Sequence, residues 1–403
     1  MIINKSEKLL NVRYDIRGSV SDEADRLERE GVSIIRLNTG NPAAFGFSAP
    51  DSVLKALSEY SDVSAPYSNS KGIPKARAAV ARYCSSIGIP GVDAEDVYTG
   101  NGVSELIQLS LQAFLNTGDE ILIPTPDYPL WTAAAILAGG TVVHYMCDEQ
   151  AGWFPDIEDI KRKITKRTRA VVVISPNNPT GAVYPRELLN DIADIARKHN
   201  LVMFSDEVYD RLVMDGFEHV SIASLAPDLF SVVFNGLSKS HQICGYRVGW
   251  IALCGDKSGA RGYIEGINTL ASLRLCSNVT GQAVICAALA DNDEVKENIM
   301  PGGRLFEQRE YAYNALITMP GISAVKPRAG LYIFPKIDTE MYGIKDDERF
   351  VLDFLREKHV LLTHGGSYNW KQPDHFRVAY LPQMDELVEV IDRLQAFLKG
   401  YHQ

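Results

Sequence analysis

Short apolar runs that end in Gly, Pro or Asn alternate with amphipathic stretches along most of this chain of 403 residues. The runs at 96–100 (DVYTG), 119–124 (DEILIP) and 169–175 (RAVVVIS) each precede a helix-like stretch, and further apolar runs follow at 201–207, 231–236 and 250–255. Continuous apolar strands between helices are typical of a mostly parallel sheet covered by helices on both faces. The sequence therefore predicts an α/β protein.

The two ends of the chain have a different pattern. Residues 22–31 form a charged, helix-like stretch closed by Gly31, and 33–38 resemble a strand. After about residue 295 the order becomes helix, strand pair, helix, strand, helix. We expect an N-terminal arm over 1–45 that forms part of a small α+β domain, a large domain over 46–295, and the remainder of the small domain over 296–403.

Charge and cysteine content exclude several classes of protein. The chain has 41 Lys and Arg against 51 Asp and Glu, a net charge of −10, which disfavours a general binder of nucleic acid or anionic membranes. Six cysteines lack the spacing of a zinc site, so we expect free thiols and no metal. Reduced thiols favour the cytoplasm, and the charged N-terminus does not resemble a secretory signal.

One stretch could be mistaken for a membrane span. Residues 128–147 contain no Asp, Glu, Lys or Arg. Pro129, the Gly139–Gly140 pair and the many small residues instead predict a buried helix, a turn and a strand. We therefore expect a soluble protein.

Polar residues follow several of the predicted strands. The segment SPNNPTG (175–181) contains Asn178, Asp206 ends the next apolar run, and Tyr209 lies three residues later. Open α/β sheets bind ligands at the carboxyl ends of their strands. Taken singly, the same residues could be a plain turn, an exposed strand end and a packing tyrosine.

The segment 235–250 (NGLSKSHQICGYRVGW) adds Ser238, Lys239 and Arg247. A lysine held in a cleft can condense with a carbonyl cofactor, and an arginine can bind a phosphate through two hydrogen bonds. The turn at 100–106 (GNGVSEL) opens a helix, whose first N–H groups can bind an anion. Alone, Lys239 would usually be a solvated lysine, and Arg377 in HFRVAY a surface arginine.

Together these features are the parts that a pyridoxal phosphate site needs. The order NNPTG, SDEVY, and SK followed by GYRVG resembles the class I aminotransferases, which are fold-type-I pyridoxal-phosphate enzymes. The resemblance covers essentially the full length, including YDIRG (14–18) and TGNPAAFGF (39–47), and is strongest to the bacterial glutamate–pyruvate (alanine) aminotransferases. It implies a large domain with a sheet of the seven-stranded type. Gln242 departs from the small residue usual in the family's lysine motif.

The resemblance also implies a role for each candidate residue. Lys239 would bind the aldehyde of pyridoxal 5′-phosphate and later carry the substrate proton, and Asp206 would pair with the ring nitrogen. The other implied contacts are Asn178 and Tyr209 with the ring oxygen, Tyr128 with the ring face, Gly102, Val103, Ser238, Arg247 and a neighbouring subunit's Tyr67 with the phosphate, and Arg377, Asn178 and Gly40 with the substrate carboxylate. The shared Tyr67 implies a homodimer.

Resemblance also implies the substrates, L-alanine and 2-oxoglutarate, exchanged by a ping-pong mechanism. A second carboxylate on glutamate calls for a second cation, for which Arg17 is the candidate, with Tyr14 shaping the same pocket; a surface arginine is the alternative. An aspartate or aromatic aminotransferase would keep every cofactor residue and differ only in the pocket. A carbon–sulfur β-lyase on the same fold would release pyruvate and ammonia from cystathionine without an oxo-acid acceptor. The ligand-sensing half of a transcriptional regulator is disfavoured, because no basic helix-turn-helix pattern precedes the core.

Overall fold

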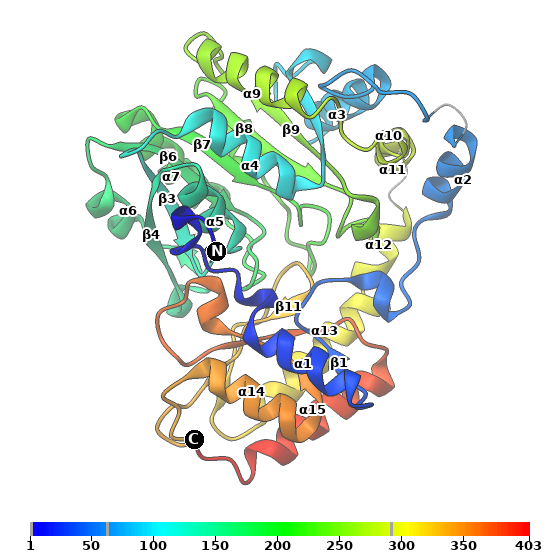
Figure 1. The fold of residues 1–403 in the computed structure, drawn as a ribbon, viewed down its shortest axis with the longest axis vertical. Helices are drawn as coiled ribbons and strands as arrows, with labels where there is room; N and C mark the ends of the chain where they lie inside the picture. Colours follow the sequence, from blue (N-terminus) through cyan, green and yellow to red (C-terminus); the bar gives the residue numbers. More distant parts are fainter. Residues whose placement is uncertain (1–2, 62–63, 291–292) are drawn as a thin grey trace.

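An eight-stranded sheet forms the centre of the larger of two domains (Figure 1). The structure is a computed structural model that describes residues 3–61, 64–290 and 293–403. The strand order is β2-β9-β8-β7-β6-β3-β4-β5. Strands β8, β7, β6, β3 and β4 are parallel, whereas β9 is antiparallel to both of its neighbours and the two-residue β5 is antiparallel to β4. The predicted α/β class and mostly parallel sheet are confirmed.

The strands of this sheet have the following bounds: β2 Val97–Asn101, β3 Glu120–Thr125, β4 Thr141–Asp148, β5 Phe154–Pro155, β6 Thr168–Ile174, β7 Val202–Asp206, β8 Ser231–Gly236 and β9 Val248–Cys254. The helices of the same part of the chain are α2 Asp51–Tyr60, α3 Pro74–Ser86, α4 Val103–Phe114, α5 Leu130–Leu137, α6 Ile157–Lys163, α7 Arg186–His199, α8 Ile222–Leu225, α9 Arg261–Leu273, α10 Val279–Ala283 and α11 Ile285–Ala290.

Both faces of the sheet are apolar and both are covered by helices. In β3, for example, Ile121 and Ile123 pack against α4, α5 and α9, whereas Leu122 belongs to the core beneath α6 and α7. Helices α2, α3 and α11 cover the end of the sheet near β9 and β2. Because successive side chains point to opposite faces, a strand buried on both sides is an uninterrupted apolar run.

The smaller domain combines both ends of the chain. In Figure 1, α1 and β1 (blue) lie among the orange and red elements of the C-terminal part. One hydrophobic core joins Val20, Ala24 and Leu27 of α1 to α13, α14 and α15. Its elements are α1 Ser19–Arg29, β1 Ile35–Arg36, α13 Arg304–Ile317, β10 Ile322–Ser323, β11 Tyr332–Ile333, β12 Lys336–Ile337, α14 Asp347–Lys358, β13 Val360–Leu361, β14 Thr363–His364, β15 Phe376–Ala379 and α15 Met384–Leu398.

The short sheets of this domain place one arginine next to one tyrosine. Strand β15 lies between β11 and β14 and is antiparallel to both, with Tyr332 opposite Ala379. Arg377, two residues before Ala379, shares its face of the strand. Helix α12 (Asp293–Ile299) spans the expected limit of the large domain at 295, and the proposed domain boundaries stay predictions.

The uncharged stretch 128–147 is a short helix, a glycine turn and a strand, as predicted: α5 ends at Leu137 and β4 begins at Thr141. In the described ranges, no helix is long and apolar enough to cross a membrane. All six cysteines are free, in agreement with the expectation from their spacing.

Candidate active site

A cavity of 630 Å³ opens at the carboxyl ends of the parallel strands and is closed by the small domain. Strands β3, β6, β7 and β8 run in one direction, so the residues that follow them meet at one edge of the sheet. The candidate residues that line the cavity are Tyr14, Arg17, Gly40, Val103, Tyr128, Asn178, Asp206, Tyr209, Ser238, Lys239, Arg247 and Arg377.

Lys239 follows β8, and its amine lies inside this cavity. Its Nζ donates a hydrogen bond to the carbonyl oxygen of Gly40 at 2.6 Å and lies 3.8 Å from Sγ of Cys244. The loop that continues from Lys239 contains two left-handed residues, Gln242 with φ of 61° and Arg247 with φ of 56°. Gln242, the departure from the family motif, lines a second, smaller cavity instead.

Asp206 ends β7 and is a buried carboxylate with no ion pair in the described part of the chain; its exposed fraction is 5%. Trp131 of α5 donates Nε1–H to its Oδ2 at 2.9 Å. Burial raises the pKa of Asp206 to about 6, although the Trp131 hydrogen bond partly opposes this. A carboxylate held in this way is suited to a cation brought in by a ligand, such as a protonated pyridine nitrogen.

Arg247 and the first residues of α4 form a positively charged site, called the cationic cradle below. Gly102 has φ of 76°, and a Cβ there would lie 2.4 Å from Nη2 of Arg247, so a larger residue would displace the guanidinium. Arg247 donates to the backbone oxygens of Asn101 (3.2 Å) and Cys244 (3.0 Å). It forms no ion pair with any carboxylate that the structure describes. The N-terminus of α4, a helix of twelve residues, lies beside the Arg247 guanidinium. These two positive groups together are suited to a phosphate.

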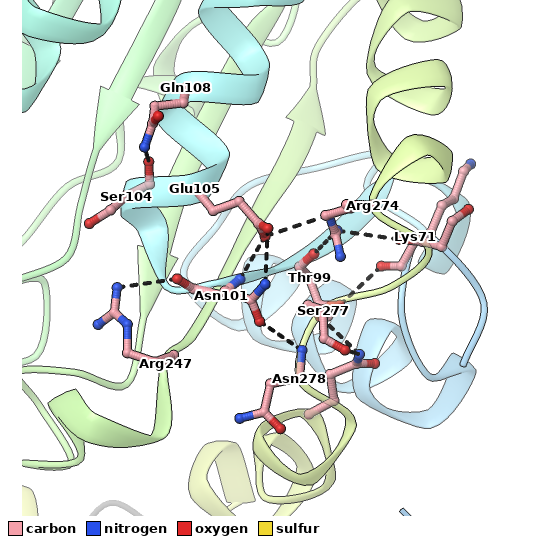
Figure 2. A network of polar contacts seen from close by, with 12 residues as sticks. Lys71, Thr99, Asn101, Ser104, Glu105, Gln108, Arg247, Arg274, Ser277 and Asn278 are labelled. Atoms are coloured by element: carbon pink, nitrogen blue, oxygen red, sulfur yellow. Dashed lines mark hydrogen bonds and ion pairs between the residues drawn. The ribbon is translucent and has the colours of Figure 1, made fainter. Parts of the chain in front are cut away.

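The cradle is held in place from behind (Figure 2). The side chain of Glu105 accepts hydrogen bonds from the backbone N–H of Asn101 at 2.8 Å and from its amide at 2.9 Å. The Asn101 Oδ1 in turn accepts from the backbone N–H of Asn278 at 2.7 Å. Arg274 lies 3.5 Å from the Glu105 carboxylate. The position of the Asn101 carbonyl that binds Arg247 is therefore fixed by several contacts.

Arg377 closes the opposite side of the cavity from β15. It is 2% exposed and donates Nη1–H to Oδ1 of Asn178 at 3.0 Å and Nη2–H to the carbonyl of Asn38 at 2.6 Å. Its guanidinium stacks on the ring of Tyr332, with Cζ 3.8 Å from the ring centroid. No carboxylate of the described ranges pairs with this buried guanidinium, which is therefore suited to a substrate carboxylate.

Tyrosine hydroxyls surround these groups. The hydroxyls of Tyr14 and Tyr128 lie 3.2 Å apart, and Tyr209 donates to the hydroxyl of Tyr332 at 3.4 Å. Burial raises the pKa of Tyr209 well above its usual value. Burial acts on Tyr332 in the same direction, but the charges of Arg377 and Lys239 outweigh it and lower the pKa of Tyr332.

Two predicted residues do not line the cavity. Tyr67 is 78% exposed and does not line the cavity within one chain. Gly102 does not line it either, although it lies against the guanidinium of Arg247, which does. Arg17 does line the cavity, but at the rim, as an exposed residue of the turn Asp15–Arg17.

Sequence reasoning missed several residues that the fold brings to the site: Asn38, Ser104, Trp131, Cys244 and Tyr332. Trp131 could have been found, because it follows Tyr128 closely in PDYPLW. Tyr332 has no such signal, since its short strand comes from the other domain.

Comparisons with known proteins agree with this arrangement. Residues 32–394 match the model of the family "Aminotransferase class I and II". The chain is 53% identical over 401 residues to the glutamate-pyruvate aminotransferase AlaA of Escherichia coli K12, covering 100% of this chain and 99% of the relative. It is 51% identical to an alanine aminotransferase of Mycobacterium tuberculosis H37Rv, covering 99% and 93%.

The fold agrees as closely as the sequence. A crystal structure of an aminotransferase from Escherichia coli superposes with a TM-score of 0.99 at 53% identity, covering 100% of both chains. The buried Asp206, the cavity amine of Lys239 and Arg247, which pairs with no carboxylate among the described residues, provide the partners that pyridoxal phosphate requires. The chain therefore belongs to the class I and II aminotransferases, enzymes that depend on pyridoxal 5′-phosphate.

Proposed function

We propose that this enzyme exchanges an amino group between L-alanine and 2-oxoglutarate, giving pyruvate and L-glutamate by a ping-pong mechanism. The observation that best supports this function is a single cavity lined by Lys239, Asp206 and Arg377. It occurs in a chain whose relatives at 53% and 51% identity are named glutamate-pyruvate and alanine aminotransferases.

In this proposal the cofactor is held through groups at each of its edges. Lys239 would bind its aldehyde carbon, Asp206 its ring nitrogen, and Asn178 and Tyr209 its ring oxygen. Its phosphate would lie against Arg247, Ser238 and the backbone of Gly102 and Val103, with Tyr128 on the ring face. These assignments are supported by the cavity lining, which includes every one of these residues except Gly102, and by the close approach of Gly102 to Arg247.

Bound pyridoxal phosphate supplies an electron sink that lets a proton leave the α-carbon of an amino acid. Arg377 would hold the substrate α-carboxylate through two parallel hydrogen bonds, which fixes the direction of the Cα–H bond. The amine of Lys239 would then take that proton at Nζ and return it later. Because the amine acts as a base and then as an acid, its position beside the Gly40 carbonyl matters at both stages.

Because the proposed enzyme uses both alanine and glutamate, one pocket must accept either a methyl group or a second carboxylate. We assign the binding of the second carboxylate to Arg17, which lines the rim of the cavity. The hydroxyl of Tyr14 contacts that of Tyr128, and these two tyrosines shape the neighbouring wall. An exposed cation can bind an anion and return to solvent when alanine is bound.

We also propose a homodimer in which Tyr67 of the partner subunit contacts the phosphate. The high exposure of Tyr67 in one chain supports this assignment. Analytical ultracentrifugation tests it, and a monomer with full activity would contradict it.

Free cysteines support a cytoplasmic location, which fractionation of cells would check.

Absorbance spectroscopy of the purified enzyme with pyridoxal phosphate tests the function directly. L-alanine should convert the visible cofactor band to the near-ultraviolet band of the aminated form, and 2-oxoglutarate should restore it. A band that responds to L-aspartate or an aromatic amino acid but not to alanine would favour those aminotransferases. Release of pyruvate and ammonia from cystathionine, without an oxo acid, would favour a β-lyase.

A further inference from the structure

Tyr332 lies where the groups of both domains meet. It belongs to β11 in the small domain, it is 4% exposed, and its ring supports the guanidinium of Arg377 at 3.8 Å. Its hydroxyl reaches across to the large domain and accepts a hydrogen bond from Tyr209 at 3.4 Å. One side chain thus contacts the proposed carboxylate-binding and cofactor-binding groups at once.

The same hydroxyl faces Lys239. A Cβ at Gly40 would lie 1.9 Å from the Tyr332 oxygen and 3.4 Å from Nζ of Lys239, so both groups converge on the backbone of Gly40. Any side chain at this point would displace the Tyr332 hydroxyl. Because Gly40 has no side chain, this segment places nothing between the phenol and the amine.

Hydrogen-bond counting leaves room for a direct interaction. A protonated lysine has three N–H donors, and a phenolic oxygen has two lone pairs. The Gly40 carbonyl and Sγ of Cys244 accept two of the three Lys239 donors, and Tyr209 uses one lone pair of Tyr332, so one donor and one lone pair remain. The charges of Arg377 and Lys239 also lower the pKa of Tyr332, which makes its oxygen the acceptor of the two phenols.

We propose that Tyr332 is a positioning residue of the reaction: its ring orients Arg377 for the substrate carboxylate, and its hydroxyl oxygen accepts a hydrogen bond from the Lys239 ammonium while Lys239 holds the substrate proton. The proton stays on Nζ, and no bond of Tyr332 forms or breaks. This inference rests on the proposed transamination.

Tyr332→Phe tests the hydroxyl and keeps the ring. The kcat for alanine with 2-oxoglutarate should fall about 10-fold, because a hydrogen bond to a charged group is lost, while KM changes by less than about twofold. The isotope effect on kcat with α-deuterated L-alanine should rise, because proton transfer becomes slower than the other steps. If Tyr332 only stabilised the fold, Tyr332→Phe would have the same isotope effect as the wild type.

Tyr332→Leu tests the ring. Relative to Tyr332→Phe, it should raise KM for alanine and 2-oxoglutarate together by about 10-fold, since the stacked support of Arg377 is lost. Tyr368→Phe is the matched control. Its ring also lies against Arg377, at 4.8 Å, but its buried hydroxyl forms no hydrogen bond with Lys239 or Tyr209 in the described part of the chain. That variant should keep the kcat and isotope effect of the wild type.

A titration of cofactor-free enzyme provides a readout that does not need activity. The charged and titratable groups that face Tyr332 are Lys239, Arg377, Tyr209, Cys244, Tyr368 and Tyr380. The ultraviolet absorbance of tyrosinate should show one tyrosine that ionises below the ordinary value of about 10, and Tyr332→Phe should remove it. The same titration curve in wild type and variant would overturn the acceptor role.

The outcomes separate this inference from the proposed function. A wild-type enzyme that does not transaminate alanine rejects the function itself. An active wild type with unchanged kcat and isotope effect in Tyr332→Phe rejects the hydroxyl role, and unchanged KM in Tyr332→Leu rejects the ring role. Cofactor absorbance and thermal unfolding of each variant establish that it is folded.

Discussion

Replacement of Asp206 by asparagine should stabilise the cofactor-free enzyme while it removes activity. Asp206 has no cation beside it in the described part of the chain, and burial raises its pKa from 3.8 to about 6. Between these two values the folded state binds more protons than the unfolded state, so stability falls as pH rises, and the loss is complete once pH exceeds the folded pKa. The unfavourable contribution at neutral pH is about 3 kcal/mol.

The asparagine side chain does not ionise and still offers an oxygen to Trp131, so the Asp206→Asn variant avoids this cost. Urea unfolding of cofactor-free protein should show Asp206→Asn more stable than wild type by about 2–3 kcal/mol near pH 8, with the difference shrinking toward pH 4. With pyridoxal phosphate the order should reverse, because only a carboxylate stabilises a protonated ring nitrogen. A cofactor-free variant that is less stable at every pH would refute the reasoning.

Three further substitutions probe the remaining groups. Arg377→Lys should lower kcat/KM about 100-fold for alanine and 2-oxoglutarate alike, because a lysine cannot bind a carboxylate as a fork; steady-state kinetics check this, and a change below about threefold would contradict it. Arg17→Ala should raise KM for glutamate about 10-fold and leave that for alanine nearly unchanged; an equal effect on both would remove Arg17 from the pocket. Trp131→Phe deletes the donor to Asp206 and should weaken pyridoxal phosphate binding about 10-fold in equilibrium titrations; unchanged affinity would show that Asp206 needs no such support.

The α/β class was predictable because each parallel strand is a local signal. A strand buried on both faces is an apolar run, and β6 and β8 are recognisable from the runs AVVVI and VVF. The residues directly after such strands were predictable for the same reason. Asp206 is the last residue of its strand, and Asn178 and Lys239 follow theirs by four and three residues; parallel strands carry their carboxyl ends to one edge.

Residues supplied by tertiary contacts were not predictable in this way. Arg377 has the local sequence of an ordinary strand, and only resemblance to a family assigned it a substrate. Tyr332 belongs to a two-residue strand in a segment without polar motifs, and its importance arises from Arg377 and Gly40, which are distant in sequence. Asn38 likewise binds Arg377 through a backbone carbonyl, which no side-chain pattern reports.

The division of the site between domains constrains how its specificity can change. The cofactor groups come from the strand ends of the large domain, whereas Arg377 and Tyr332 come from the small one. A short joint aligns the two: Asn369 donates to Asp127 at 2.6 Å, and the backbone N–H of Asp127 donates to the backbone oxygen of Tyr368 at 3.0 Å. Asp127 precedes Tyr128 of the cavity wall, and Tyr368 lies against Arg377. Movement of Arg377 relative to Lys239 would therefore strain this joint, so new substrates are more easily accommodated at the exposed rim, where Arg17 lies, than at the buried carboxylate fork.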